Sequence, residues 1–150
     1  MIQKIRVTKE FSFEMSHVLS DYDGPCRNIH GHSYRLFVTV AGTPLNDPGN
    51  PKNGMVIDFN ELKQIVNDEI INIFDHSVAV CSDYVKTKLD TLKSIFSNIV
   101  TIDYQPTCEN LAADFAQRIK NRIPGNAKLY SIKLFETATS FAEWFSSDNE

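Results

Sequence analysis

Cysteine, histidine and long apolar stretches are scarce in this sequence of 150 residues. No segment approaches the roughly 20 consecutive apolar residues of a membrane-spanning helix, so a membrane protein is not expected. The first residues, Met1 to Arg6, lack the apolar stretch of a secretory signal. Three cysteines, Cys26, Cys81 and Cys108, cannot all pair within one chain, which argues against a disulfide framework. We therefore expect a reduced, soluble, cytoplasmic protein.

Positive charge is also in short supply. The chain has 15 lysines and arginines against 19 aspartates and glutamates, a formal net charge of -4. A general nucleic-acid binder would normally carry a basic patch, so that class of partner is not expected. With 42% hydrophobic and 11% aromatic residues the chain can form a core. No repeat or linker divides it, and we expect residues 1–150 to form a single domain.

Two segments near the N-terminus alternate between apolar and polar residues. From Ile5 to His17 the odd positions form the more apolar face, and from His30 to Val40 the even positions do. A period of two predicts β-strands with one buried face. If the two strands pair as an antiparallel hairpin, His17 meets His30 and His32 at one end of the sheet, because residues i and i+2 share a face.

The remainder of the chain predicts helices and strands in turn. The expected elements are a loop over 42–54, a helix through 74, a weaker helix over 85–97, a strand over 99–104, a helix from 107 to 123, and strands over 129–135 and 141–145. Asp58 is the expected N-cap of the first helix, with Glu61 completing a capping box. This order predicts an α+β fold in which helices cover one face of the sheet.

Three of the four histidines thus converge, and an apolar core would not gather three imidazoles without a partner for their nitrogens. Three neutral imidazoles suit Zn²⁺ and leave one coordination position open. Cys26 lies four residues before His30. It is either a fourth ligand that closes the site or a nearby thiolate whose pKa is lowered by the cation and by Arg27.

Three further groups have both a functional and a structural interpretation. Asp75 and His76 form either a general acid/base pair or the end of a helix, where histidine suits the dipole. Glu136 is either an exposed charge at a strand end or a carboxylate that pairs with a planar donor edge. Thr107 and Glu109 are most simply the N-cap and first turn of a helix.

These residues together resemble the 6-pyruvoyl-tetrahydropterin synthase / 6-carboxytetrahydropterin synthase family, over roughly Phe11 to Thr139. The matching motifs are Phe13 to His17, Cys26 with His30-Gly31-His32, Gly54 to Phe59, Asp75-His76, Pro106 to Asn110, and Glu136-Thr137. The three-residue gap between Cys26 and His30 resembles the 6-carboxytetrahydropterin synthase branch, which serves queuosine (7-deazaguanine) synthesis. The 6-pyruvoyl branch is the nearest alternative.

The resemblance assigns roles to single residues. It implies that His17, His30 and His32 hold a catalytic zinc. It implies that Cys26 is a proton acceptor instead of a ligand and that Asp75 and His76 form a relay with it. Glu136 would anchor the pterin ring and join the relay, and Thr107 and Glu109 would also touch the pterin.

The family also implies a fold and a reaction. The fold is the tunnelling fold, in which antiparallel sheets of several subunits close into a barrel with active sites at the interfaces. A homo-oligomer is expected, a hexamer of two stacked trimers. The implied activity is that of a zinc-dependent lyase that converts 7,8-dihydroneopterin triphosphate to 6-carboxy-5,6,7,8-tetrahydropterin, releasing acetaldehyde and triphosphate.

Two departures and two rival functions accompany this interpretation. The segment from Ser77 to Gln105 is longer than usual in the family, and the tail from Phe141 to Glu150 differs from the usual ending. The rivals are a zinc-stabilised binding module, with Cys26 as fourth ligand, and a zinc hydrolase that cleaves simple phosphates or amides.

Overall fold

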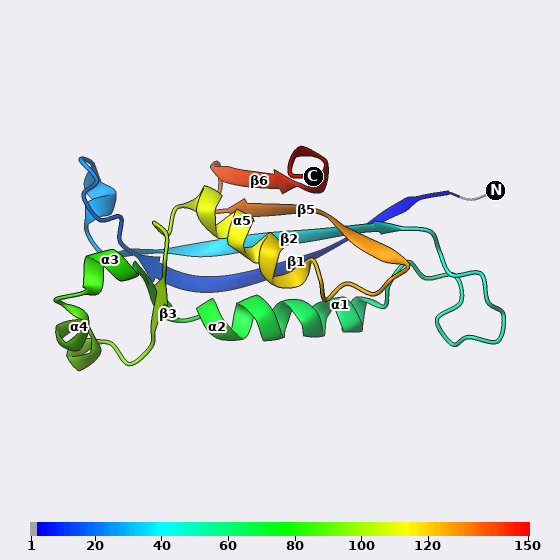
Figure 1. Cartoon of the computed structure of the whole chain (residues 1–150), viewed down its shortest axis with the longest axis horizontal. Helices are drawn as coiled ribbons and strands as arrows, with labels where there is room; N and C mark the ends of the chain where they lie inside the picture. Colours follow the sequence, from blue (N-terminus) through cyan, green and yellow to red (C-terminus); the bar gives the residue numbers. More distant parts are fainter. Residues whose placement is uncertain (1–2) are drawn as a thin grey trace.

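A six-stranded sheet forms the centre of the computed structural model, which describes residues 3–150. The strand order is β4-β3-β1-β2-β5-β6. Two long strands, β1 (Ile5–His17) and β2 (His30–Gly42), lie in the middle and run the length of the molecule (Figure 1). Shorter strands flank them on both sides: β3 pairs with the end of β1, and β5 pairs with the second half of β2 from Arg35 onward.

The predicted hairpin of the first two strands is confirmed. β1 pairs antiparallel with β2 in a register that places His17 opposite His30 and Met15 opposite His32. β1 has the predicted bounds, and β2 runs to Gly42, two residues beyond the predicted end. The apolar faces of both strands are buried, and their other faces are largely exposed. The period-two pattern therefore fixed both the pairing and the face on which the histidines lie.

β5 (Ala127–Phe135) and β6 (Phe141–Phe145) continue the sheet on the far side of β2 by antiparallel pairing. β6 has the predicted bounds, and β5 begins two residues earlier than predicted. Leu134 and Ile132 face the same side as the buried residues of β2. The chain emerges from β5 at Glu136, beside the end of the sheet that carries the histidines.

Helices cover one face of this sheet, as predicted (Figure 1). α1 (Phe59–Val66), a π-helical segment (Asn67–Ile71) and α2 (Asn72–Phe74) follow one another without a break. Asp58 is the N-cap and accepts a hydrogen bond from the amide of Asn60. The capping box is wrong: Glu61 instead accepts a hydrogen bond from Lys52 Nζ at 2.8 Å.

α5 (Cys108–Ile119) packs over the same face, across β5 and β6. Thr107 is its N-cap and accepts a hydrogen bond from the amide of Asn110. The helix ends at Ile119, one turn before the predicted end at Ile123, and a turn follows. Between helices and sheet lies the main core, in which Phe115 packs edge to face against Phe13 and Phe74.

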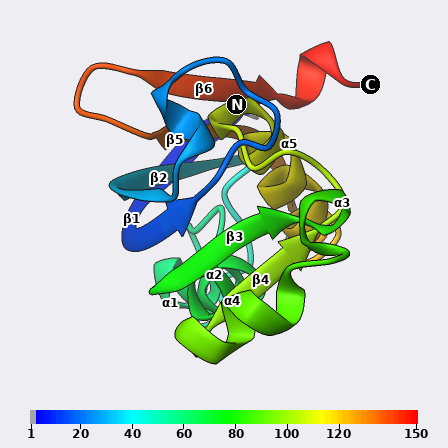
Figure 2. The same cartoon turned by 90° about the vertical axis from the view of Figure 1, so that its left-hand side faces the viewer.

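The long segment from Ser77 to Gln105 adds a small unit at one end of the molecule (Figure 2). It consists of β3 (Ser77–Cys81), α3 (Ser82–Val85), α4 (Leu89–Ile95) and β4 (Ile99–Ile102). β3 pairs parallel with the end of β1, and β4 pairs parallel with β3. The sheet is therefore mixed: the antiparallel arrangement predicted holds for β1, β2, β5 and β6, and the two parallel pairings were not predicted.

A second, smaller core holds this unit together. Val78 and Val80 point away from Ala79 and pack with Leu89, Leu92 and other side chains of the segment. All five residues of β3 are buried, because the main core lies on one side of the strand and this small core on the other. The weak helix predicted over 85–97 is thus present as the shorter α4, and Leu89 and Leu92 face inward as predicted.

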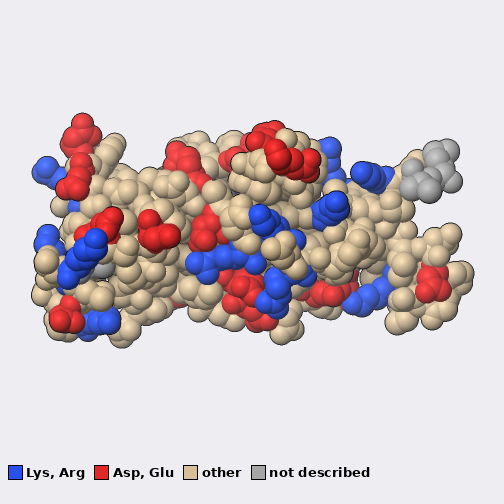
Figure 3. Space-filling model, in the orientation of Figure 1, with Lys and Arg blue, Asp and Glu red and all other residues tan. Residues whose placement is uncertain are grey.

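The surface carries charges of both signs. On the face shown in Figure 3, lysine and arginine side chains are interspersed with aspartate and glutamate over the whole length of the molecule. Within residues 3–150, none of the helices is both long and apolar enough to cross a membrane.

Candidate functional site

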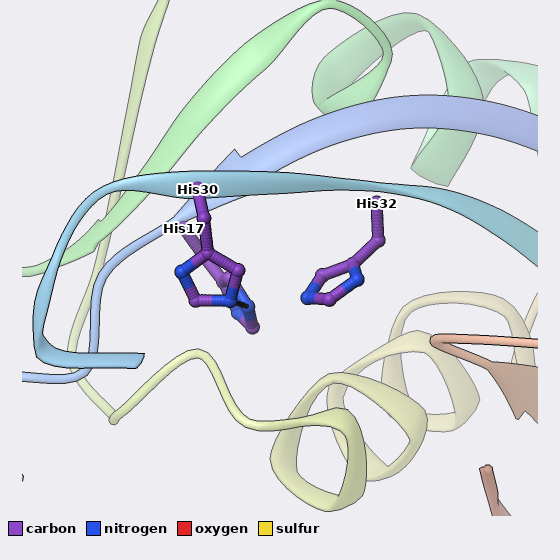
Figure 4. A group of neighbouring side chains, drawn as sticks. All are labelled: His17, His30 and His32. Atoms are coloured by element: carbon purple, nitrogen blue, oxygen red, sulfur yellow. Dashed lines mark hydrogen bonds between the residues drawn. The ribbon is translucent and has the colours of Figure 1, made fainter. Parts of the chain in front are cut away.

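Three imidazoles converge where β1 ends and β2 begins (Figure 4). His17 is the last residue of β1, and His30 and His32 are the first and third residues of β2. One nitrogen from each ring can be chosen so that all three atoms lie within 4.8 Å of one another. The strand register makes this cluster, since His17 faces His30 directly and His32 projects from the same face two residues on.

The outer ring nitrogens of two histidines are held by backbone carbonyls. His17 Nδ1 lies 2.7 Å from the carbonyl oxygen of Pro106, and His30 Nδ1 lies 2.8 Å from that of Asn28. Because a carbonyl only accepts, each Nδ1 must carry the proton, and each neutral ring presents an unprotonated Nε2. The two Nε2 atoms face each other at 3.0 Å. Two lone pairs at that distance require a shared cation between them, either a proton or a metal ion.

His32 also has a ring nitrogen whose lone pair lacks a partner among the described residues. Its Nε2 is buried and has no hydrogen-bond partner among the residues that the structure describes. The nearest carboxylate oxygen, Glu136 Oε1, lies 3.6 Å away, beyond hydrogen-bonding distance. An unsatisfied buried polar atom costs roughly 1–3 kcal/mol. A ligand that takes the lone pair of His32 would remove this cost.

Burial keeps these rings in the form that binds metal. Removal from water lowers the pKa of His17 and of His32, and the nearby Glu136 carboxylate opposes this only in part. A neutral imidazole is the form that coordinates a metal ion. Together with the backbone acceptors that orient His17 and His30, this donor set fits Zn²⁺ with three protein ligands and an open position.

Cys26 lies outside this cluster of ligand atoms. Among residues 3–150, the group that could hold one ion consists of the three histidines only. Cys26 sits in a 3₁₀ turn, Pro25–Arg27, within the loop that joins β1 to β2. The geometry therefore favours a site with an open coordination position over one closed by a Cys26 thiolate.

Next to the histidines lies a pocket of about 300 Å³. It brings together five residues singled out from the sequence: His17, Cys26, Thr107, Glu109 and Glu136. They come from four places in the fold: the end of β1, the β1–β2 loop, the N-terminus of α5, which supplies both Thr107 and Glu109, and the residue after β5. Glu136 is 23% exposed and points a carboxylate toward His32. The pocket thus combines a metal-binding edge, a thiol and a carboxylate.

Asp75 and His76 are not part of this pocket. Asp75 accepts a hydrogen bond from the amide of Glu14 at 2.9 Å, and the His76 amide donates to the Glu14 carbonyl at 2.6 Å. His76 lines another cavity, of about 380 Å³, together with Glu14, Ser33 and His32. The side chains of Glu14 and Ser33 belong to the exposed face of the sheet, opposite the imidazoles. Within one chain, the predicted relay therefore lies outside the pocket that contains Cys26 and Glu136.

The pair itself is well formed. His76 Nδ1 lies 2.9 Å from Asp75 Oδ1, and His76 has a positive φ of 56°, a backbone conformation uncommon for histidine. The carboxylate holds the proton on Nδ1 and leaves Nε2 directed outward on a side chain that is 78% exposed. This geometry suits a proton carrier that acts on a partner outside its own subunit.

Three contributors to the site were missed by sequence reasoning. The Pro106 carbonyl is a backbone atom and leaves no mark in the residue pattern. Tyr34, whose hydroxyl lies 3.5 Å from His17 Nδ1, could have been found, because it shares the even-numbered face of β2 with His30 and His32. Cys108 lines the pocket as well, beside Thr107 and Glu109.

Cys108 and Tyr34 both remain neutral in this setting. Burial raises the pKa of the Cys108 thiol to about 11, and the thiol donates to the carbonyl oxygen of Leu134 at 3.2 Å. Burial likewise raises the pKa of Tyr34 far above its usual range. Neither group is a ready nucleophile or base, and Cys26 is the other thiol that lines this pocket.

The fold and the site define an α+β protein in which a three-histidine cluster that could hold a metal ion lies beside a pocket. The chain belongs to the 6-pyruvoyl tetrahydropterin synthase family, whose model matches residues 6–146. A protein from Haemophilus influenzae named 6-carboxy-5,6,7,8-tetrahydropterin synthase is 35% identical, over 93% of this chain and 97% of its own length. A protein of the same name from Synechocystis is 38% identical, over 93% of this chain and 92% of its own length.

The fold comparison agrees. The structure of Caenorhabditis elegans 6-pyruvoyl tetrahydropterin synthase matches 97% of this chain and 97% of its own, with a TM-score of 0.68 and 21% identity. The tunnelling fold expected from the sequence is thereby confirmed, and the added β3 and β4 account for part of the longer segment between Ser77 and Gln105.

Proposed function

We propose that this chain is a zinc-dependent lyase that converts 7,8-dihydroneopterin triphosphate and one water to 6-carboxy-5,6,7,8-tetrahydropterin, acetaldehyde and triphosphate. The observation that carries the proposal is a cluster of three histidines beside a pocket lined by His17, Cys26 and Glu136, in a chain whose relatives bear that enzyme's name. We further propose that the product enters queuosine synthesis and that the enzyme works in the cytoplasm, where the three free thiols of this chain stay reduced.

His17, His30 and His32 would hold the metal, with Nδ1 of His17 and of His30 fixed by the carbonyls of Pro106 and Asn28. Bound there, zinc would supply a Lewis acid that polarises oxygens of the substrate side chain and acidifies neighbouring groups. His17 and His30 undergo no proton exchange in this scheme, because their Nδ1 atoms donate to backbone carbonyls.

Glu136 would bind the pterin ring. Its carboxylate is positioned at the pocket wall, and two parallel hydrogen bonds to the 2-amino and N3–H edge would fix the ring plane. Thr107 and Glu109, at the start of α5, would contact the same ring from the other side of the pocket. Such anchoring orients the substrate side chain toward the metal edge of the pocket and reduces the entropy cost of reaction.

Cys26 would act as the proton acceptor, since it lines the pocket and Cys108 is held neutral. Asp75 and His76 would complete the relay, with Glu136 as its third member. Because the pair lies on the opposite face of its own sheet, we propose that a second copy of the chain brings it to the pocket. A homo-oligomer, a hexamer of two stacked trimers, would provide that contact.

Product analysis tests this proposal and its nearest alternative. The family model and the Caenorhabditis elegans structure bear the name 6-pyruvoyl tetrahydropterin synthase, so the pyruvoyl-forming reaction is the second candidate. Zinc-loaded protein incubated with 7,8-dihydroneopterin triphosphate should release acetaldehyde in equal amount to triphosphate. Release of triphosphate without acetaldehyde would support the pyruvoyl reaction and refute the carboxy reaction.

Replacing Cys26 with alanine distinguishes the enzyme hypothesis from the hypothesis of a zinc-stabilised binding module. We expect the variant to keep one zinc per chain and to lose turnover by about 10²–10⁴-fold, the usual contribution of a positioned acid or base. The matched control is Cys81→Ala, in the buried strand β3. Loss of zinc and unfolding in Cys26→Ala, but not in Cys81→Ala, would show that Cys26 is a structural ligand and would refute its catalytic role.

A further inference from the structure

The loop that carries Cys26 is fastened to the fold by one side chain from a distant part of the sequence, Gln105. Its Oε1 accepts hydrogen bonds from the amide of Ser20 at 3.2 Å and from the Ser20 hydroxyl at 3.1 Å. Its Nε2 donates to the Ser20 carbonyl oxygen at 2.6 Å. Three hydrogen bonds therefore join Gln105 to a single residue of the loop between β1 and β2, 85 positions earlier in the chain.

From Ser20 the connection reaches Cys26 in one further step. The neighbouring residue, Leu19, donates its amide to the carbonyl oxygen of Cys26 at 3.0 Å, which closes the loop on itself. Fixing Ser20 thus limits the movement of the turn on which the Cys26 thiol sits. The turn itself is exposed at Pro25 and Arg27, so packing against the core contributes little to holding it.

The backbone of Gln105 is tied to the other side of the pocket. Its carbonyl oxygen accepts from Asn110 Nδ2 at 3.0 Å, in the first turn of α5. The next residue, Pro106, supplies the carbonyl that orients His17, and Thr107 after it caps α5 and lines the pocket. Gln105 therefore lies between the loop that carries Cys26, the proposed metal ligand His17 and the N-terminal end of α5.

We propose that Gln105 is a positioning residue of the proposed reaction: it sets the distance of Cys26 from the metal cluster and from the substrate held by Glu136 and Thr107. The inference rests on the function proposed above. Because the side chain of Gln105 binds only the loop, while its backbone serves α5 and His17, the side chain can be removed without disturbing metal or substrate binding. A shift of about 1 Å in a catalytic group can lower turnover by roughly 10²-fold.

The test compares substitutions that remove different numbers of the three bonds. Gln105→Met keeps the shape and removes all of them, and Ser20→Ala removes only the one made by the hydroxyl. Gln105→Glu keeps both acceptor bonds and loses the donor bond. The matched control is Gln64→Met, the same change on an exposed position of α1. Zinc content, kcat, KM and hydrogen exchange of the 18–29 segment are measured for each.

For Gln105→Met we expect full zinc content, a KM within about threefold of wild type and a kcat lowered by about 10–100-fold. Exchange of the 18–29 segment should become at least tenfold faster, with no change in α1. Gln105→Glu should also lower kcat, because its second carboxylate oxygen faces the Ser20 carbonyl oxygen and repels it. Ser20→Ala should lower kcat by no more than about threefold. A purely structural role would lower thermal stability but leave kcat per folded, zinc-loaded molecule unchanged, and that result would overturn the proposal.

The exchange measurement does not depend on the proposed reaction. If wild-type protein turned over no pterin but Gln105→Met still loosened the 18–29 segment, the proposed function would fail and the fastening of the loop would stand. If exchange of that segment were the same in Gln105→Met, Gln64→Met and wild type, the positioning role would be refuted whatever the activity.

Discussion

Replacing His32 with leucine should reverse the order of stability between metal-free and metal-loaded protein. His32 Nε2 is buried and lacks a hydrogen-bond partner among the described residues, and its side chain is only 18% exposed. Without metal, this atom costs the folded state about 1–3 kcal/mol. Leucine, of similar size and without polar atoms, removes that cost. In a chelator, His32→Leu should therefore unfold at a higher temperature than wild type, by about 2–4 °C for each kcal/mol.

With zinc the order should invert. Wild type gains RT ln(1 + [Zn]/Kd), which is about 4.1 kcal/mol at a free zinc concentration 1,000 times Kd. This exceeds the upper limit of the cost that leucine relieves, so wild type becomes the more stable protein. The variant, with two of three ligands, should show little zinc-dependent stabilisation.

Thermal unfolding followed by circular dichroism, at one protein concentration with and without chelator, measures both orders. The control is Gln64→Met, at an exposed position of α1 far from the cluster in sequence, which should change the free energy of unfolding by less than about 0.5 kcal/mol in either condition. A metal-free His32→Leu protein less stable than metal-free wild type would refute the argument from the unsatisfied nitrogen. Equal zinc stabilisation of both proteins would refute the assignment of His32 as a ligand.

Three further outcomes are expected. Glu136→Gln should lower kcat/KM by about 10–150-fold at unchanged zinc content, because a charged acceptor is worth about 1.5–3 kcal/mol; steady-state kinetics that match wild type would exclude Glu136 as the ring anchor. Metal-free protein should lose stability between pH 7.5 and 5.5, because burial lowers the pKa of His17 and His32 below the value of about 6.5 that unfolded histidine has. The unfolded state therefore takes up more protons than the folded state as the pH falls. Equal free energies of unfolding in urea at the two pH values would contradict this. Phe115→Ala should cost about 3–5 kcal/mol in urea unfolding, since the ring is fully buried between Phe13 and Phe74; a loss below 1 kcal/mol would mean that this part of the core is not close-packed.

The sequence predicted the metal cluster because its geometry depends on two simple regularities. Alternation assigns His17, His30 and His32 to one face, and antiparallel pairing of the two consecutive strands brings the three side chains together. Long-range packing was not required for this step. The pocket residues Thr107 and Glu136 were also recognisable, because each stands at the end of a strongly patterned element.

Other features could not be predicted for identifiable reasons. β3 is buried on both faces, so Ser77–Cys81 shows no alternation, and five such residues do not distinguish a strand from a loop. Glu61 does not complete the predicted capping box, because its carboxylate instead accepts a hydrogen bond from Lys52, nine residues earlier. The separation of Asp75 and His76 from the imidazoles depends on which face of β1 the returning chain meets, and that is decided by the fold as a whole.

The hydrogen bond between His17 Nδ1 and the Pro106 carbonyl joins residues 89 positions apart. During synthesis, all three metal ligands leave the ribosome within the first 32 residues, but the acceptor that fixes the His17 tautomer follows only after two thirds of the chain. The early N-terminal segment therefore has the ligands without their preorganisation. The three histidines are therefore fully oriented only after the segment that leads into α5 has packed against the end of β1.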